Sequence, residues 1–303
     1  MEKILGCFPA CCWGFAYGSG VFLQIGYSEK NNPLIDIIMV VDDPTQWHFE
    51  NIAMNPSHYS SLKLFGADAV AKVQICGMGK VYFNTDVSLH LEDGVQVDVK
   101  YGVIGKADLL RDLSKWEFLY TSGRLHKPVL FLEKPDLLIK EALDQNLLHA
   151  MHVSCLLLND STFSDVELFR TISRISYAGD IRMAFAENPR KVDNIVLGNL
   201  PQFRNLYSRF LQDSPPASFL GNIHKISEDT FRVAINDDRR SDILNSLPIT
   251  SLRERKTTNT DILSSLQSLV RHSSRHQTVK GVLTAGPTKA FFYSMKKIAK
   301  RFL

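Results

Sequence analysis

The 303-residue sequence predicts an α+β fold, and three observations support this prediction. Residues 34–41 are short, rich in β-branched residues and apolar on both faces, which is typical of a central strand. Over residues 95–104, valines alternate with Gln, Asp and Lys, which is the period of a half-buried strand. Beyond Pro135 the sequence becomes mostly helical in character. We therefore expect a sheet-containing domain over residues 1–132 and a mostly helical domain over residues 133–287.

The composition narrows the class of protein. Apolar residues make up 45% and charged residues 22% of the chain, which is normal for a globular protein. No stretch reaches the roughly 18 consecutive apolar residues of a membrane span, and a net charge of +3 is too small to indicate nucleic acid as a partner. The five cysteines are odd in number and lack zinc spacing, so we interpret them as reduced thiols. We expect a protein that is not integral to a membrane and binds no nucleic acid.

A glycine-serine turn follows the first apolar segment of the chain. Gly18 and Gly20 have no Cβ, so the backbone can turn sharply there and approach a ligand closely. Ser19 brings a hydroxyl and a backbone N–H to the same point, and successive N–H groups of this kind suit a phosphate. The alternative is an ordinary turn, because Gly-Ser-Gly is common in turns.

The predicted central strand carries one carboxylate, Asp36. A lone carboxylate in such a strand is costly unless a cation or hydrogen bonds satisfy it. A glycine-serine turn followed by a strand aspartate is what a nucleotidyltransferase needs, with the turn holding a triphosphate and the aspartate holding magnesium. Alternatively, Asp36 is a hydrogen-bonded strand-end residue. A second acid two residues after Asp36 would point at the same metal, but position 38 holds isoleucine, and Asp42 lies about 20 Å along an extended strand. Asp98 on the second predicted strand is therefore a candidate second metal ligand.

Several further segments are predicted from local signals. Pro44 follows an Asp-Asp turn in the manner of a helix-start proline. His48, Asn51 and Tyr59 have polar tips that suit a base or a sugar, although they equally suit a loop held by its own hydrogen bonds. We expect an amphipathic helix over 107–120 with Gly123 as its C-cap, helices over 137–158, 165–175 and 192–211 with a capping box at Ser164, and a flexible segment near 214–259.

The last residues, 288–303, predict a basic amphipathic helix. A basic helix with aromatic residues on its apolar face suits an anionic membrane surface. The alternative is a terminal helix docked on the protein's own core. The apolar stripe consists of Phe291, Met295, Ile298 and Phe302, and the basic residues are Lys289, Lys296, Lys297, Lys300 and Arg301.

Seven groups of residues together resemble one known family, although each group alone is unspecific. They lie at 15–22, 36–43, 47–60, 100–103, 119–128, 176–183 and 280–286. In these positions the sequence is similar to the mitochondrial CDP-diacylglycerol synthases, the phosphatidate cytidylyltransferases of the mitochondrial translocator assembly and maintenance protein family. The resemblance spans almost the whole chain.

The resemblance implies a polymerase-β-like nucleotidyltransferase domain with a mixed sheet, a winged-helix-like second domain and a membrane-binding C-terminal helix. It implies that CTP and phosphatidic acid give CDP-diacylglycerol and pyrophosphate with Mg²⁺. It also implies a peripheral protein on the matrix side of the mitochondrial inner membrane that supplies cardiolipin and phosphatidylglycerol synthesis. The compartment rests on the resemblance, because residues 1–5 carry no arginine and do not look like a transit peptide. One explanation is that a leader has been lost.

The expected roles follow from this reaction. Gly18, Ser19 and Gly20 would hold the triphosphate, Asp36 would hold magnesium, and Lys100 would neutralise phosphate charge. Candidates for further phosphate contacts are Arg124, Lys127 and Arg182, and His48, Asn51 and Tyr59 are candidates for the nucleoside. Two rivals remain at this point: a nucleotidyltransferase acting on RNA or protein, and a non-catalytic peripheral membrane scaffold. The oligomeric state and the lipid chain preference are not predicted.

Overall fold

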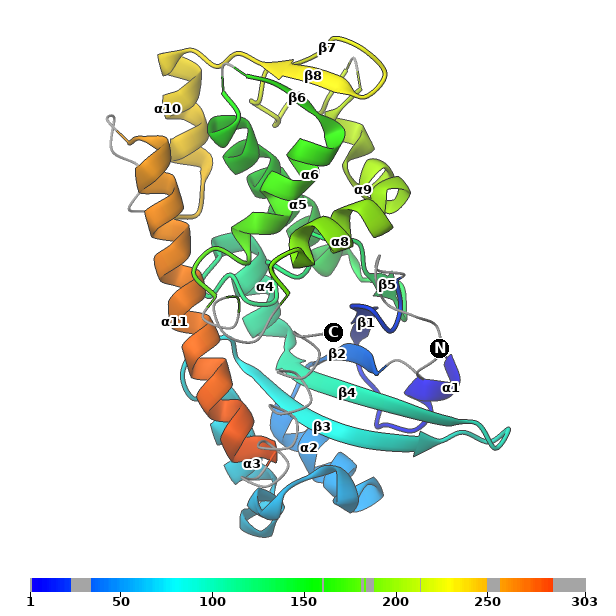
Figure 1. Ribbon diagram of the computed structural model, residues 1–303. Coiled ribbons are helices and arrows are strands. Elements are labelled where there is room, and N and C mark those ends of the chain that lie inside the picture. Colours follow the sequence, from blue (N-terminus) through cyan, green and yellow to red (C-terminus); the bar gives the residue numbers. More distant parts are fainter. Residues whose placement is uncertain are drawn as a thin grey trace.

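The computed structural model describes residues 2–22, 34–159, 161–180, 183, 188–212, 214–249 and 257–285. It confirms the predicted α+β class. Figure 1 shows a five-stranded sheet with its helices in the lower part of the view and a mostly helical part above it. We call these the sheet region (residues 2–132) and the helical region (residues 133–285).

The sheet region is built on a mixed sheet whose middle strand is β2 (Ile35–Val41). The strand order is β3-β4-β2-β1-β5, with β2 parallel to β4 and the remaining neighbours antiparallel. The apolar run at 34–41 therefore forms the central strand that it predicts. The other strands are β1 (Trp13–Tyr17), β3 (Val81–His90), β4 (Gln96–Gly105) and β5 (Leu130–Phe131).

The two faces of this sheet pack against different helices. Ile38 and Val40 of β2 belong to a buried cluster with residues of α4 (Lys106–Lys115) and the first turns of α5 (Leu137–Leu157). Ile37 and Met39 belong to a cluster on the opposite face, with Trp47 of α2. Helix α2 (Pro44–Met54) starts as predicted, since the Asp43 side chain accepts hydrogen bonds from the backbone N–H groups of Thr45 and Gln46. The remaining elements are α1 (Glu2–Leu5), η1 (Pro56–His58), η2 (Ser61–Phe65) and α3 (Gly66–Ile75).

The helical region has its own core. The stacked rings of Phe169 and Phe203, whose centroids are 5.2 Å apart, lie in it with Tyr207. The predicted capping box at Ser164 is confirmed. Residues 223–246, within the segment predicted as flexible, form β7, β8 and α10, while 250–256 lie outside the described residues. The elements are β6 (Thr162–Ser164), α6 (Asp165–Ile175), α8 (Lys191–Gly198), α9 (Leu200–Tyr207), η3 (Ser208–Phe210), β7 (Ile223–Lys225), β8 (Thr230–Val233), α10 (Asp237–Ser246) and α11 (Asn259–Ala285).

Helix α11 runs along one side of both regions (Figure 1). Its first half contributes Ile262, Leu266 and Val270 to the core of the helical region. Further along, the Gln277 side chain donates a hydrogen bond to the carbonyl of Met78 at 3.2 Å. The Lys280 amine donates to the carbonyl of Gln74 at 2.9 Å. A division at residue 132 assigns α11 to the second domain alone, whereas the helix binds both regions.

Two predictions need a correction or a limit here. Gly123 is not a helix C-cap: α4 ends at Lys115, and Trp116, in the left-handed conformation with φ 47°, is its cap. The predicted membrane helix at 288–303 lies outside the described residues. Among the described helices, none combines the length and the apolar character that crossing a bilayer requires.

Candidate active site

The glycine-serine turn lies directly against Asp36. Gly18 has φ +83°, and its carbonyl accepts hydrogen bonds from the N–H groups of Val21 at 3.1 Å and Phe22 at 3.0 Å. A Cβ atom on Gly18 would lie 3.3 Å from Oδ2 of Asp36. Gly20 is equally constrained, since a Cβ there would collide with the carbonyl of Leu34. The structure therefore brings together the two features that the sequence singles out, and Ser19 between the glycines is exposed.

Lys100 stands opposite Asp36 on the neighbouring strand. The two residues are register partners in the parallel pair β2–β4. The Lys100 amine lies 3.6 Å from Oδ1 of Asp36 and 4.6 Å from the centre of the Phe83 ring. The two charged side chains keep 16% and 27% of their surface exposed, so both remain accessible to a ligand. The residue predicted to hold magnesium, Asp36, and the residue predicted to neutralise phosphate charge, Lys100, therefore lie side by side.

Tyr17 and Arg124 extend the site. Tyr17 is the register partner of Asp36 on β1. The guanidinium of Arg124 lies 5.4 Å from the centre of the Tyr17 ring and 4.0 Å from that of Tyr120. Burial raises the pKa of Tyr17 to about 12, against the opposing effect of the Arg124 charge. At neutral pH the Tyr17 hydroxyl therefore keeps its proton and is able to donate a hydrogen bond to a ligand.

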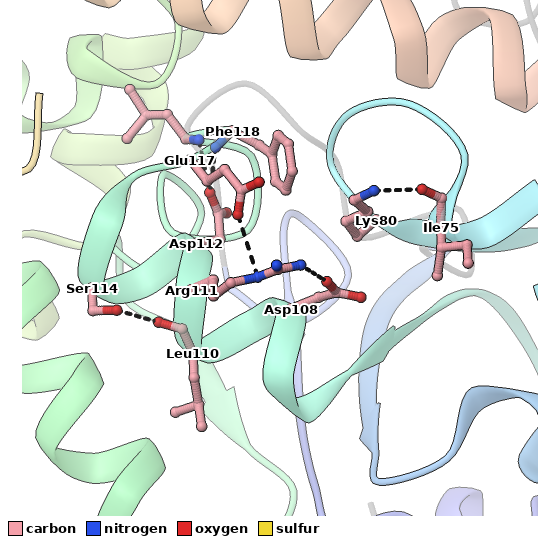
Figure 2. A network of polar contacts seen from close by, with 10 residues as sticks. Ile75, Lys80, Asp108, Leu110, Arg111, Asp112, Ser114, Glu117 and Phe118 are labelled. Carbon is pink, nitrogen blue, oxygen red and sulfur yellow. Dashed lines mark hydrogen bonds and ion pairs between the residues drawn. The ribbon is translucent and has the colours of Figure 1, made fainter.

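The loop that carries Arg124 is organised by one buried carboxylate, Asp112 of α4. Its Oδ1 accepts hydrogen bonds from the backbone N–H groups of Phe118 at 2.9 Å and Leu119 at 2.8 Å. Its Oδ2 accepts from those of Thr121 at 2.8 Å and Ser122 at 2.9 Å. Figure 2 shows Asp112 pointing at the start of this loop, next to the Arg111 side chain that bridges Asp108 and Glu117. Four backbone donors on one carboxylate fix the loop that leads to Arg124 and Lys127.

Lys127 has an unusual environment for an amine. It donates hydrogen bonds to the carbonyl of Gly123 and, at 2.7 Å, to the Ser176 hydroxyl. Burial and, to a smaller extent, the positive charges of Arg124 and Lys191 together lower its pKa to about 7. Ser176 follows α6, so Lys127 connects the sheet region with the helical region.

The three nucleoside candidates lie elsewhere. The His48 ring is 2.8 Å from both the Tyr59 hydroxyl and the side-chain amide oxygen of Gln74, and the Asn51 side chain donates to the hydroxyls of Tyr59 and Tyr101. Tyr101 follows Lys100 on β4 and points to the opposite face of the sheet. Burial lowers the pKa of His48 to about 4, so the ring is neutral. The structure therefore does not bring these side chains to Asp36, and it shows the self-bonded network that was the alternative.

The second metal candidate, Asp98, is engaged by a neighbouring strand. The Ser88 hydroxyl donates a 2.6 Å hydrogen bond to its Oδ1. Asp98 lies two residues before Lys100 on the same face of β4, so it is a diagonal neighbour of Asp36. Diagonal neighbours on a sheet are about 7–8 Å apart. Within the described part of the chain, no three His, Cys, Asp or Glu side chains form a metal-binding group. Asp36 still fits Mg²⁺, which is commonly bound by one or two carboxylates together with substrate phosphates.

Three residues at or around this site were not singled out from the sequence. Tyr17 lies next to the glycine turn, but nothing in the sequence joins it to Arg124. Asp112 carried a signal, since it occupies the apolar stripe of its helix between Leu109 and Leu113. Lys191 had no local signal. Arg182 and the terminal membrane candidates lie outside the described residues: Lys289, Phe291, Met295, Lys296, Lys297, Ile298, Lys300, Arg301 and Phe302.

Comparisons with known proteins agree on one family. A family model described as mitochondrial phosphatidate cytidylyltransferase matches residues 1–261 and 249–300. A protein of that name from Schizosaccharomyces pombe is 39% identical over 318 residues, which cover 95% of this chain and 79% of the relative. The proteins of that name from Xenopus laevis and Rattus norvegicus are 38% and 36% identical, cover 99% of this chain, and are themselves covered to 93% and 94%.

Proposed function

Because the chain belongs to the family of mitochondrial phosphatidate cytidylyltransferases, we propose that it transfers CMP from CTP to phosphatidic acid. The products are CDP-diacylglycerol and pyrophosphate. The observation that carries the proposal is the contact between the Gly18 turn and the Asp36 carboxylate, with Lys100 paired opposite. It supports the proposal because a glycine turn suits a phosphate, a carboxylate suits Mg²⁺ and a cation beside them suits further phosphate charge.

The reaction is an in-line displacement at phosphorus. A phosphate oxygen of phosphatidic acid forms a bond to the α-phosphorus of CTP, and the bond from that phosphorus to the bridging oxygen of the β-phosphate breaks. Because this nucleophile is already an anion, the enzyme does not need a strong general base. It must align the two substrates and neutralise the charge that gathers between them. A site made of a turn, one carboxylate and several cations matches that need.

We assign the roles from position. The Gly18–Ser19–Gly20 turn holds phosphate oxygens through backbone N–H groups and the exposed Ser19 hydroxyl. Lys100 and Arg124, whose charges both act on Tyr17, neutralise phosphate charge, and the protonated Tyr17 hydroxyl donates a hydrogen bond. Lys127 adds a further cation beyond Arg124.

Asp36 would hold Mg²⁺ together with the substrate phosphates. When bound, the ion supplies charge neutralisation and orientation to the phosphate oxygens. The Lys100 amine at 3.6 Å keeps the carboxylate in place on the strand.

The finer features of the family remain part of the proposal. We propose that the sheet region is a nucleotidyltransferase domain and that the helical region, with its three-stranded sheet β6-β8-β7, is winged-helix-like. Residues 288–303 would bind the anionic surface of the mitochondrial inner membrane on its matrix side, where the product feeds cardiolipin and phosphatidylglycerol synthesis. The content of lysine, arginine and aromatic residues in that segment supports this assignment.

The test is a conversion assay with CTP labelled at the α-phosphate and liposomes that contain phosphatidic acid. We expect label in CDP-diacylglycerol and release of pyrophosphate. Parallel reactions with RNA and with protein as acceptors examine the rival transferases. Label in one of those acceptors, or no transfer at all by the folded protein, would contradict the proposal.

A further inference from the structure

Two leucines at the start of α5 face the solvent. Leu137 and Leu138 keep 68% and 58% of their surface exposed, although the next residue of the helix, Ile139, is fully buried. Phe131, on the edge strand β5 (Figure 1), is 46% exposed. We call Phe131, Leu137 and Leu138 the apolar corner. Exposed apolar residues gathered in this way mark surfaces that bind membranes, ligands or other proteins.

The segment that joins β5 to α5 is held by specific contacts. The indole N–H of Trp13 donates a hydrogen bond to the carbonyl of Glu133 at 3.1 Å. Asp136 caps α5, since its side chain accepts from the backbone N–H of Ile139 at 2.9 Å. The same carboxylate pairs with the Lys106 amine at 2.7 Å. Because the first turn is fixed in this way, Ile139 packs in the core while the two leucines before it stay outside.

A row of aromatic rings connects the apolar corner with the candidate active site. The Phe131 ring lies 5.3 Å from that of Trp13, and Phe131 is the register partner of Phe15. The Phe15 ring lies 5.3 Å from that of Trp13 and 5.9 Å from that of Tyr17. Tyr17 is in turn the register partner of Asp36. Paired residues of neighbouring strands point to the same face, so Phe131 and Asp36 share one face of the sheet.

The separation between the corner and the site matches the size of a lipid. Phe131 is two strands away from Asp36 and offset by two residues. With strands about 4.8 Å apart and a rise of about 3.3 Å per residue, their Cα atoms are roughly 12 Å apart. The hydrocarbon part of one bilayer leaflet is about 15 Å thick. A lipid with its phosphate at Asp36 is therefore long enough to place its acyl chains beside the corner.

The charged residues around the corner cancel one another. Glu133, Lys134, Lys140 and Glu141 are all exposed, and their net charge is zero. An anionic surface therefore attracts this part of the protein only weakly, whereas its apolar side chains gain free energy on leaving water. Residues 288–303 differ in this respect, because all their charged residues are basic.

We propose that the apolar corner is a bilayer contact, in which Phe131, Leu137 and Leu138 enter the acyl region of the membrane that supplies phosphatidic acid. This rests on the proposed function, which gives the enzyme a lipid substrate, and it adds a contact to the one expected of residues 288–303. With the corner in the bilayer, the face of the sheet that carries Asp36 is brought to the headgroups. The lipid phosphate then reaches the site while its acyl chains stay in the membrane.

The first experiment replaces both leucines in the full chain, as Leu137→Ser with Leu138→Ser. The matched control is Leu64→Ser with Phe65→Ser, which removes an apolar pair that is 79% and 76% exposed. That pair belongs to η2, which packs on α3 and, through it, on α2, the helix on the opposite face of the sheet. Circular dichroism monitors the fold of both proteins.

Binding is measured by co-sedimentation with liposomes of phosphatidylcholine and phosphatidic acid, at low and at high salt. We expect the substitution of the two leucines to lower the liposome affinity at least about tenfold, because two leucines lose their burial. The factor should be the same at both salt concentrations, since no charge is changed. The control pair should leave the affinity unchanged.

Kinetics of the same proteins separate the bilayer from the substrate molecule. For the protein without the two leucines, we expect the KM for phosphatidic acid in liposomes to rise about tenfold and the KM for CTP to stay the same. Dihexanoyl phosphatidic acid, used below its critical micelle concentration, should be converted at the wild-type rate. An equal loss with this dissolved lipid would assign the leucines to the substrate's own acyl chains and overturn the bilayer contact.

A second measurement detects insertion directly. Leu138→Trp places a fluorophore in the corner, and phosphatidylcholine with brominated acyl chains, mixed with phosphatidic acid, quenches tryptophans that enter the acyl region. The native Trp13, Trp47 and Trp116 are buried, so the wild-type protein supplies the background. We expect quenching above this background for Leu138→Trp and none above it for Leu64→Trp.

The outcomes that oppose the bilayer contact are distinct from those that oppose the proposed function. Undiminished liposome affinity of the folded protein without the two leucines, or no added quenching in Leu138→Trp, would overturn the contact. A wild-type dimer that the same substitution dissociates, with liposome affinity unchanged, would assign the corner to a second copy of the chain. A wild-type protein that passes both membrane tests but transfers no CMP would contradict the proposed function alone.

Discussion

Oδ2 of Asp36 lies 3.3 Å from the point that a Cβ atom on Gly18 would occupy. A side chain at position 18 would therefore contact the carboxylate that we propose to hold Mg²⁺. The left-handed backbone of Gly18, with φ +83°, excludes most other residues for a second reason. The turn and the carboxylate are consequently in contact. The change at Asp36 is expected to affect the transfer rate, and the change at Gly18 is expected to affect CTP binding.

Asp36→Asn keeps the shape of the side chain but removes its charge. We expect cytidylyl transfer to fall at least about a hundredfold, on the scale of losing one key electrostatic group, while the fold is retained. The rate is measured with saturating CTP, and circular dichroism monitors the fold. A folded Asp36→Asn protein with wild-type activity would remove Asp36 from the site.

Gly18→Val should be more severe than Ser19→Ala. Valine at position 18 is β-branched, requires a strained backbone and contacts Asp36, whereas alanine at position 19 removes one exposed hydroxyl. We expect calorimetry to show no measurable CTP binding for Gly18→Val and binding weakened about tenfold for Ser19→Ala. CTP binding by Gly18→Val at wild-type affinity would show that the turn is not a phosphate loop.

The low pKa of Lys127, about 7, predicts a pH dependence. A phosphate prefers the protonated amine. Below pH 7 Lys127 is already charged, whereas above pH 7 binding must take up a proton. The KM of the substrate that contacts Lys127 should therefore rise up to about tenfold per pH unit above 7. Arginine stays charged throughout this range, so Lys127→Arg should lack this rise. Because substrate titration affects both proteins equally, it cancels in the ratio of the wild-type KM to the Lys127→Arg KM at each pH. Equal slopes in both proteins would contradict the assignment.

Asp112→Asn tests the carboxylate that fixes the loop. The amide nitrogen of asparagine cannot accept, so two of the four backbone N–H groups lose their acceptor. Each buried donor left unpaired costs about 1–3 kcal/mol, so the thermal midpoint should fall clearly. Asp108→Asn, on the same helix, loses only a pair with the half-exposed Arg111 and should change stability by less than about 1 kcal/mol. Equal effects of the two substitutions would contradict the role of Asp112.

Removal of residues 289–303 tests the predicted membrane segment. We expect the truncated protein to lose co-sedimentation with liposomes containing cardiolipin or phosphatidic acid, because each basic residue near such a surface contributes about 1 kcal/mol. CTP binding should remain, since the Gly18 turn and Asp36 lie in the sheet region. In the full chain, liposome binding should weaken as salt rises. Undiminished sedimentation of the truncated protein would place the membrane contact elsewhere.

The features that could be predicted from the sequence depend on local chemistry. Asp43 and Pro44 start α2, Ser164 caps α6, and the apolar run ending at Val41 forms the central strand. The pairing of Gly18 with Asp36 was also accessible, because a strand following a turn in an antiparallel pair returns beside it. Apart from the Gly18–Asp36 pairing, which spans 18 positions, these signals lie within a few residues of the structure that they specify.

The remainder depends on contacts between distant segments. Lys127 meets Ser176 across 49 positions, and no periodicity reports that contact. The polar tips of His48 and Asn51 suggest a nucleoside site, but the fold places both side chains on the opposite face of the sheet from Asp36. There both of them form hydrogen bonds with the Tyr59 hydroxyl. Gly123 was interpreted as a cap because the apolar spacing continues to residue 119, whereas the chain leaves the helix at Trp116 and turns over Asp112.

The attachment of α11 to the start of β3 has a consequence for biosynthesis. β3 is an outer strand of the five-stranded sheet, and such edges pair readily with other chains when they are exposed. Gln277 reaches the carbonyl of Val81, the first residue of that strand, across 196 positions of the chain. Until residue 277 has been synthesised, the start of β3 lacks its contact with α11. Chains that stop short of α11 should therefore aggregate through β3, even though they contain every residue of the Gly18–Asp36 unit.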